Sequence, residues 1–160
     1  MAAVEQPLAA GANEICGFRF ESLPLNGHCQ GQTAFFFAEE RVLFAADTLS
    51  EIEFPSLTEE RYSLEEYLKD LDTLAPLLSQ VDWVVPGHGT PTASAKAQET
   101  LQADRKYLQK LQSFNRSSLI RDFEGAARKL VEELGDARAD LPDAYEMHLQ
   151  NLRLLSARMK

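Results

Sequence analysis

The sequence predicts an α/β (α+β) fold, in which a mixed sheet packs against helices and the chain then continues as further helices. Three observations lead to this prediction. Two apolar runs, Thr33 to Ala38 and Arg41 to Ala46, flank the polar pair Glu39-Glu40, which is typical of a hairpin of buried strands. A helical pattern of leucines follows, and then a short apolar run from Asp82 to Pro86. From Thr92 onward the pattern is helical, so the sheet precedes most of the helices.

The elements before the hairpin are weaker in pattern. Residues 1–14 are mostly small, so we expect a mobile lead-in there and a single domain over residues 15–160. The first strand is expected over Ile15 to Leu25, with Pro24 near its end. After the hairpin, Ser63 is a suitable N-cap for a helix whose leucines recur at helical spacing, and Pro76 is expected to bend that helix.

The last third of the chain predicts three amphipathic helices. Their expected ranges are Ala93 to Gln112, Ser118 to Leu134 and Pro142 to Arg158. There are no internal repeats, so we place no domain boundary. Within the single domain, residues 15–112 contain the strands and residues 113–160 are expected to form a helical extension.

Composition and charge restrict the function. The formal charge of −9, from 25 acidic and 16 basic residues, argues against nucleic acid or an anionic membrane as a partner. The first residues lack a basic segment followed by an apolar one, and no apolar run is long enough to cross a bilayer, so we expect a cytoplasmic protein. Cys16 and Cys29 fit neither a disulfide framework nor a C-x-x-C pair and are expected to be ordinary thiols.

Three polar side chains are expected at the ends of strands. His28 precedes the hairpin, Asp47 follows it directly, and His88 follows the third apolar run between two glycines. Imidazole nitrogens and carboxylate oxygens are ligands of zinc, and catalytic zinc sites keep one position open for water. A metal site is therefore one interpretation. The alternatives are that each histidine is an ordinary hydrogen-bonding residue and that Asp47 caps the turn after its strand.

Three motifs occur in order around these residues: GHCQGQTAFFF from Gly27, RVLFAADTL from Arg41 and VVPGHGT from Val84. Together they resemble motifs of the metallo-β-lactamase-fold hydrolase superfamily, in its group of general and glyoxalase-II-like hydrolases. The resemblance covers Ile15 to Leu111. It implies that His28 binds a first zinc ion, that His88 binds a second, and that Asp47 bridges both ions and orients the metal-bound hydroxide.

The sequence also departs from the motifs of this superfamily. Ala46 stands where glycine usually precedes the bridging aspartate, and Cys29-Gln30 stands in place of Thr-Pro. The His-x-His-x-Asp-His motif, which supplies most of the metal ligands, is absent, since His148 is the only other histidine. The resemblance therefore implies the C-terminal half of a four-layer αββα sandwich, with a C-terminal helical extension and without the N-terminal half.

Two functions are compatible with three matching motifs and an absent His-x-His-x-Asp-His motif. In the first, the parent protein is a zinc hydrolase in which metal-activated water attacks an ester, thioester, lactone or similar bond of a small-molecule substrate. This chain alone is then expected to be inactive or weakly active, with one zinc ion weakly held or none. In the second, the chain is a non-catalytic binding or assembly module. It would pair its exposed sheet with a second copy or with the missing N-terminal half, through Phe35, Phe37, Leu43 and Val84 or their neighbours at alternate positions.

Other residues that could join such a site have simpler interpretations. His148 lies on the apolar stripe of the last predicted helix and is expected to pack or cap there. Cys29 is expected to be a small residue that fills its loop, with a soft metal ligand or a reactive thiol as the alternatives. The basic residues of the predicted helices are expected on a solvated face. They are Lys106, Lys110, Arg116, Arg121, Arg128 and Lys129.

Overall fold

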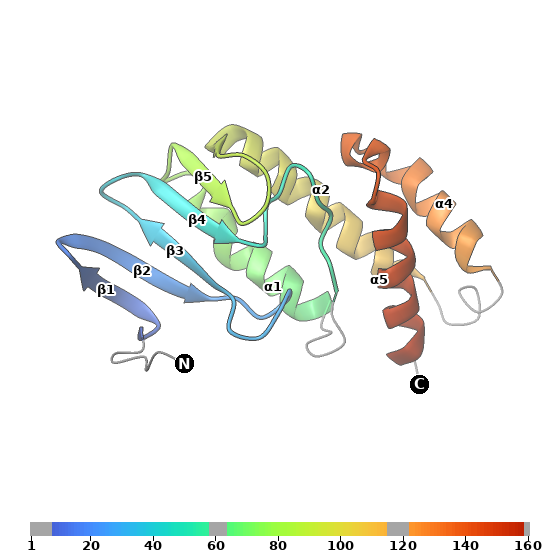
Figure 1. Cartoon of the computed structure of the whole chain (residues 1–160), viewed down its shortest axis with the longest axis horizontal. Coiled ribbons are helices and arrows are strands. Elements are labelled where there is room, and N and C mark those ends of the chain that lie inside the picture. Colours follow the sequence, from blue (N-terminus) through green and yellow to red (C-terminus); the bar gives the residue numbers. More distant parts are fainter. Residues whose placement is uncertain (1–7, 58–63, 115–121, 159–160) are drawn as a thin grey trace.

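The computed structural model of the protein describes residues 8–57, 64–114 and 122–158. In this part of the chain a six-stranded mixed sheet packs against helices, which confirms the predicted α+β class (Figure 1). The strands lie side by side in chain order, and all neighbours are antiparallel except β4 and β5, which are parallel. The strands are β1 (Gly11–Ile15), β2 (Phe18–Pro24), β3 (Thr33–Phe37), β4 (Val42–Ala46), β5 (Trp83–Pro86) and β6 (Thr92–Ala93). The helices are α1 (Leu64–Leu74), α2 (Ser94–Ser113), α4 (Phe123–Leu134) and α5 (Ala144–Arg158), with short 3-10 helices η1 (Ala75–Leu77) and η2 (Ala137–Asp140).

The predicted hairpin is confirmed as β3 and β4, which pair from Phe35 with Phe44 to Phe37 with Val42. Its turn contains Arg41 with a left-handed φ of 57°. The helix predicted after it is also confirmed, and it gives way to 3-10 geometry at Ala75, beside Pro76. Because α1 crosses from β4 to β5, the two strands can run parallel.

The N-terminal prediction is wrong over residues 11–14, which form most of strand β1 rather than a lead-in. The first predicted strand is also wrong at its start, because Ile15 ends β1 and β2 begins at Phe18. Cys16 and Gly17 both adopt positive φ, of 53° and 85°, and form the two-residue turn between these strands. Such turns favour Asn-Gly or Asp-Gly, so Cys-Gly gave no clear signal. Residues 1–7 lie outside the described residues.

The helices of the last third are close to their predicted ranges. Helix α2 is displaced by one residue, and α5 begins two residues later than predicted. Helix α4 begins at Phe123, and residues 115–121 lie outside the described residues, as does the predicted N-cap Ser63. Strand β6 and helix η2 were not predicted. None of the helices that the structure describes has the length and apolarity needed to cross a bilayer.

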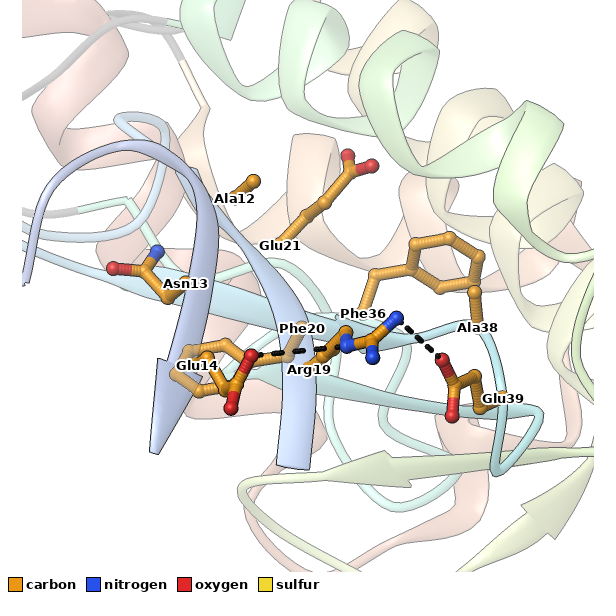
Figure 2. A pocket seen from close by; sticks show the side chains of 9 residues that line it. All are labelled: Ala12, Asn13, Glu14, Arg19, Phe20, Glu21, Phe36, Ala38 and Glu39. Carbon is orange, nitrogen blue, oxygen red and sulfur yellow. Dashed lines mark ion pairs between the residues drawn. The ribbon is translucent and has the colours of Figure 1, made fainter. Parts of the chain in front are cut away.

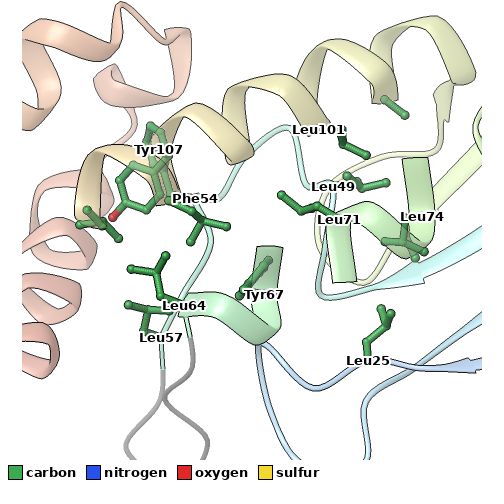
Figure 3. Packing of buried hydrophobic residues seen from close by; sticks show 14 of the residues in the cluster. Leu25, Leu49, Phe54, Leu57, Leu64, Tyr67, Leu71, Leu74, Leu101 and Tyr107 are labelled. Atoms are coloured by element: carbon green, nitrogen blue, oxygen red, sulfur yellow. The ribbon is translucent and has the colours of Figure 1, made fainter. Parts of the chain in front are cut away.

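Helices α1 and α2 cover one face of the sheet. Helices α4 and α5 lie beside α2 and cover neither face of the sheet (Figure 1). The core forms between α1, α2 and the sheet, and it continues past α2 to α4 and α5 through the loop after β4 (Figure 3). Leu43 and Val84 are fully buried in it, so the expectation that they lie on an exposed face is wrong. Both β4 and β5 are apolar at nearly every position, and their sequences therefore do not show which face is covered.

The opposite face of the sheet is uncovered by the described residues. Phe35 and Phe37 lie on it, as predicted, and their rings pack with Phe20 at centroid distances of 5.8 and 5.1 Å. Phe44 and Trp83 keep 42% and 52% of their surface exposed, which is unusual for large apolar side chains. Strand register gives the apolar members of this open face. They are Ile15, Phe18, Phe20, Phe35, Phe37, Val42, Phe44, Trp83 and Val85.

Candidate functional site

His28, Asp47 and His88 lie at one edge of the sheet because of the direction in which their strands run. His28 is in the loop after β2, Asp47 follows β4, and His88 follows β5. Strands β2 and β4 are both antiparallel to β3, and β5 is parallel to β4, so the three strands run in the same direction. Their carboxyl ends therefore meet at one edge, where loops present side chains.

The carboxylate of Asp47 lies between two imidazoles. Its Oδ2 is 3.5 Å from Nε2 of His28, and its Oδ1 is 3.5 Å from Nε2 of His88. The fold thus brings together all three side chains that the sequence singled out. Each imidazole faces a different oxygen of the carboxylate. Among the described residues there is no group of three or more His, Cys, Asp or Glu side chains around a single metal position.

Glu53 is a fourth polar side chain beside this group, and the sequence did not identify it. Its Oε1 is 3.8 Å from Nδ1 of His88, whereas Asp47 faces the other ring nitrogen, Nε2. Histidines that bind metals commonly have a carboxylate at their other nitrogen, which fixes the ring and its tautomer. Glu53 stands two residues after Glu51 in the loop that follows β4, and no pattern distinguishes it there from a surface acid.

The backbone beside Asp47 needs conformations that suit glycine. Ala46 and Leu49 have left-handed φ values of 50° and 58°. Gly87 donates its N–H to the carbonyl of Ala46 at 2.6 Å, so the loops after β4 and β5 are joined directly. A Cβ atom at Gly87 would overlap Oδ1 of Asp47. The glycine before His88 is therefore required sterically by the carboxylate of the neighbouring loop.

Helix α1 fixes the loops of both His28 and Asp47. The carboxylate of Asp70 accepts the backbone N–H groups of Gly27, at 2.6 Å, and of the preceding residue, at 2.9 Å. Burial raises the pKa of Asp70, although these hydrogen bonds oppose the shift. The hydroxyl of Tyr67 donates to the carbonyl of Asp47 at 3.2 Å, and a Cβ atom at Gly27 would overlap Tyr67. The helix and the His28 loop are therefore in direct backbone contact.

The loop that follows β4 is fixed from its other side by Arg138, a buried arginine of η2 that the sequence did not identify. Its guanidinium donates to the carbonyls of Ser50, at 3.1 Å, and Glu53, at 2.7 Å. It also donates to the carboxylate of Asp104 on α2 at 2.7 Å and lies 4.5 Å from the centre of the Phe54 ring. One side chain from the C-terminal helical region thus holds the loop that contains Glu53.

Arg138 lies between two carboxylates of different character. Burial raises the pKa of Asp104 to about 7, and the neighbouring guanidinium offsets only part of this. Burial opposes ionisation of Asp136 as well, but its hydrogen bonds with Arg138 outweigh burial and lower its pKa. Burial also opposes the charge of Arg138, whose pKa is nevertheless raised by Asp136 and Asp104. Asp136 therefore balances the guanidinium charge first, and Asp104 is the acid that protonates more easily.

His148 packs in the core, as predicted. Its ring lies 4.7 Å from that of Phe54, and its Nδ1 is 3.1 Å from the hydroxyl of Tyr107. Asn151 donates to the same hydroxyl at 2.8 Å, so the imidazole, the phenol and the amide form one buried polar cluster. Burial lowers the pKa of His148 to about 4. Asn151 also accepts the N–H of Leu57 at 2.9 Å, which fixes the far end of the loop after β4.

The other candidates occupy ordinary positions. Cys29 is a half-buried free thiol. Lys110 and Lys129 both pair with Glu133, in agreement with a charged outer surface on these helices. Arg116 and Arg121 lie outside the described residues.

The candidate site lies at the surface. A cavity of about 10 Å³, enough for roughly one water molecule, borders His28 and Asp47. A larger hollow of about 440 Å³ lies over β1 to β3, where Arg19 lies between Glu14 and Glu39 at 3.7 and 3.6 Å (Figure 2). None of the three predicted site residues lines this hollow, so it is separate from the candidate site.

Comparison with known proteins gives no matching family model and no matching curated sequence. Solved structures do match. A metallo-β-lactamase family protein from Thermus thermophilus is 25% identical, with a TM-score of 0.62 over 94% of this chain. An inverting sec-alkylsulfatase from Pseudomonas sp. is 19% identical, with a TM-score of 0.66 over 97%. A β-lactamase domain protein from Burkholderia ambifaria is 17% identical, with a TM-score of 0.55 over 94%.

These matches cover most of this chain but only part of each other protein. The chain spans 48% of the Thermus protein, 26% of the sulfatase and 45% of the Burkholderia protein. The similarity thus extends over the sheet and the helices together, and it agrees with the resemblance of the three motifs. The chain is therefore a partial metallo-β-lactamase-fold domain, related through that fold to a superfamily of hydrolases.

Proposed function

We propose that this chain supplies His28, Asp47 and His88 to the metal centre of a metallo-β-lactamase-superfamily hydrolase. The observation that supports this proposal is the position of the Asp47 carboxylate, with an imidazole 3.5 Å from each of its oxygens. Related solved structures share the fold over nearly the whole chain. The bond to be hydrolysed would be an ester, thioester, lactone or a similar bond of a small molecule.

The donor types suit zinc, because imidazole nitrogen and carboxylate oxygen are both common zinc ligands. The opening left by glycine at position 87 gives the carboxylate its place between the histidines. The donors suit two neighbouring positions better than one, so further ligands would come from residues that face this sheet edge. When bound, zinc would lower the pKa of a water molecule and polarise the bond to be broken.

The residues of this chain would act through position and charge. Asp47 would orient the attacking water and balance positive charge between the two histidines. The carboxylate of Glu53 favours a proton on Nδ1 of His88, which leaves the Nε2 lone pair directed to the Asp47 side. Tyr67 and Asp70 would keep the two loops at a fixed separation through their hydrogen bonds to the backbone.

Zinc titration by calorimetry tests the metal centre. We expect the chain to bind zinc weakly, and the His88→Ala variant to bind at least tenfold more weakly, since one of three ligands is removed. Cys16→Ser is the matched control, because Cys16 is an exposed thiol in the turn between β1 and β2. Equal affinity in the wild type and the His88→Ala variant would reject this set of ligands.

We expect little hydrolysis by the chain alone. With zinc, it should hydrolyse simple thioesters and lactones no faster than His88→Ala. Three ligands alone lack the further ligands and hydrogen-bonding groups that would position the attacking water. Zinc-dependent turnover that disappears in His88→Ala would show that these three ligands suffice.

A second function, in assembly, is favoured by the open face of the sheet. Contiguous exposed apolar surface of this kind usually marks an interface. The occupant would be a second copy of the chain or an N-terminal half of the fold. A stable dimer that contains no zinc would favour this function, and near-stoichiometric zinc in the purified protein would favour the first.

A further inference from the structure

An apolar cavity of about 320 Å³ lies beside the candidate site. Ile52, Glu53 and Phe54, in the loop that follows β4, form one wall. The other wall comes from the chain around the start of α5, and it includes Leu141 and Met147. The volume of the cavity is at the lower end of the range of about 300–1,000 Å³ for small-molecule pockets.

Two residues connect this cavity to the candidate site. Glu53 lines the cavity, and its carboxylate lies 3.8 Å from Nδ1 of His88. Ile52 also lines the cavity, and a Cβ atom at Gly89 would lie 3.5 Å from its Cγ1. The wall formed by Ile52 and Glu53 is therefore next to the loop that contains His88.

The charges around the cavity restrict its ligand. Among the described residues, Glu53 and Asp143 line it, and no basic residue does. An anionic group would be repelled there, while an uncharged apolar group would gain contact with Phe54, Leu141 and Met147. Ile52 is 47% exposed, so part of this apolar surface is open to a ligand without any movement of the core.

We infer that this cavity receives the apolar acyl or alkyl group of an uncharged substrate whose reacting bond lies near His88. Only the position of the reacting bond near His88 rests on the proposed hydrolase function, since binding of the apolar group in the cavity requires no metal. Each methylene buried in such a cavity strengthens binding by up to about fourfold. Affinity should therefore rise with chain length until the cavity is full.

Binding is measured on the full chain with ¹³C-methyl methionine, and the Met147→Leu variant identifies the Met147 signal. Methyl hexanoate should shift this signal saturably and bind about four- to fifteenfold more tightly than methyl butanoate. Hexanoate ion should bind at least fivefold more weakly than its methyl ester. The imidazole signals of His88 should move in the same titration. The inference would be overturned if the Met147 signal showed no saturable shift. It would also be overturned if methyl hexanoate bound no more tightly than methyl butanoate, or no more tightly than hexanoate ion.

Two variants of exposed residues separate the cavity from general apolar binding. Ile52→Asp should weaken binding of methyl hexanoate at least fivefold, because it adds a charge to the cavity wall. Ile15→Asp is the control, since Ile15 is equally exposed on β1, and it should leave binding unchanged. Equal losses in both variants would overturn the inference.

The zinc titration is an independent readout. Ester binding without zinc binding keeps the cavity and rejects the metal centre. Zinc binding without ester binding keeps the metal centre and rejects the cavity. Movement of Met147 without movement of His88 rejects the link between them.

Discussion

At the scale of single residues, Ala46 is a position where the backbone of the candidate site conflicts with its side chain. Its φ of 50° is left-handed, and Cβ crowds the following carbonyl in that conformation. Glycine adopts the same conformation without this conflict. The side chain is small, so its removal leaves little packing to lose.

We therefore expect Ala46→Gly to raise the free energy of unfolding by about 1 kcal/mol, since relief of strain exceeds the added entropy of the unfolded chain. Urea unfolding measures the difference. Ala45→Gly is the control, because Ala45 is a fully buried strand residue and its replacement should destabilise the fold. A decrease in both variants would contradict the argument.

The pKa values of two buried residues give opposite pH dependences. His148 has a folded pKa of about 4, lowered by burial from 6.5, so the unfolded chain binds a proton first as the pH falls. The stability that His148 contributes is then present above pH 6.5 and is lost between pH 6.5 and 4. Asp104 has a folded pKa of about 7, raised by burial from 3.8. Its contribution is present below pH 3.8 and is lost as the pH rises to about 7.

We expect the free-energy difference between the wild type and His148→Gln to fall by up to about 3 kcal/mol as the pH falls from 6.5 to 4. The difference between the wild type and Asp104→Asn should rise over the same interval. Urea unfolding at pH 4.5, 5.5 and 6.5 measures both. Free-energy differences that stay constant with pH would refute the shifted pKa values of His148 and Asp104.

At the scale of elements, the loop after β4 is held by hydrogen bonds from α1, η2 and α5. Arg138 is central, since it is 5% exposed and donates to the loop at Ser50 and Glu53. Without Arg138, Asp104 is buried either as an uncompensated charge or in its protonated form, and two loop carbonyls lose their donor. The cost then exceeds that of the lost hydrogen bonds.

Replacement of Arg138 by Met should therefore destabilise the fold by about 3–5 kcal/mol. Replacement of Asp104 by Leu in the same chain should recover at least about 1 kcal/mol, because no buried acid then lacks its partner. The recovery should be partial, since the two loop carbonyls still lack their donor. Chemical unfolding of the single and double variants tests this. A double variant less stable than Arg138→Met would contradict it.

Some elements and site residues could be predicted from the sequence because their signals are local. The hairpin of β3 and β4 follows from two apolar runs around a polar turn, and His28, Asp47 and His88 follow from motifs in order. Arg138 and Glu53 could not, because their contact joins positions 85 residues apart. Strand β1 was missed because Cys16 takes a left-handed conformation that the residue type does not favour.

At the scale of the whole molecule, one face of the sheet is covered by α1 and α2, and none of the described elements covers the other. Full burial of each half-exposed side chain of the open face, namely Ile15, Phe18, Phe44 and Trp83, would stabilise an assembly by at most about 1.5–3 kcal/mol before the costs of association. Helices α4 and α5 lie elsewhere (Figure 1). A partner for this face is therefore favoured energetically.

We expect the purified chain to be a dimer or a larger assembly, and Phe44→Lys with Trp83→Lys to make it a monomer. Both side chains are exposed, so the fold should tolerate the changes. Sedimentation velocity gives the assembly state, with Ile52→Lys as a control of similar exposure outside the sheet face. A wild-type chain that sediments as a compact monomer and binds no hydrophobic dye would contradict this expectation.

The distance along the chain between the loop after β4 and the residues that hold it has a consequence for synthesis. Pro55 and Leu57 bond to Asn151, which a ribosome adds roughly 5–20 s later at ordinary rates of elongation. During that interval the strands can pair, while the loop from Ser50 to Leu57 still lacks its hydrogen bonds to Arg138 and Asn151. A release of the chain before Arg138 would leave a paired sheet with an unfixed loop, which is a substrate for proteases and chaperones.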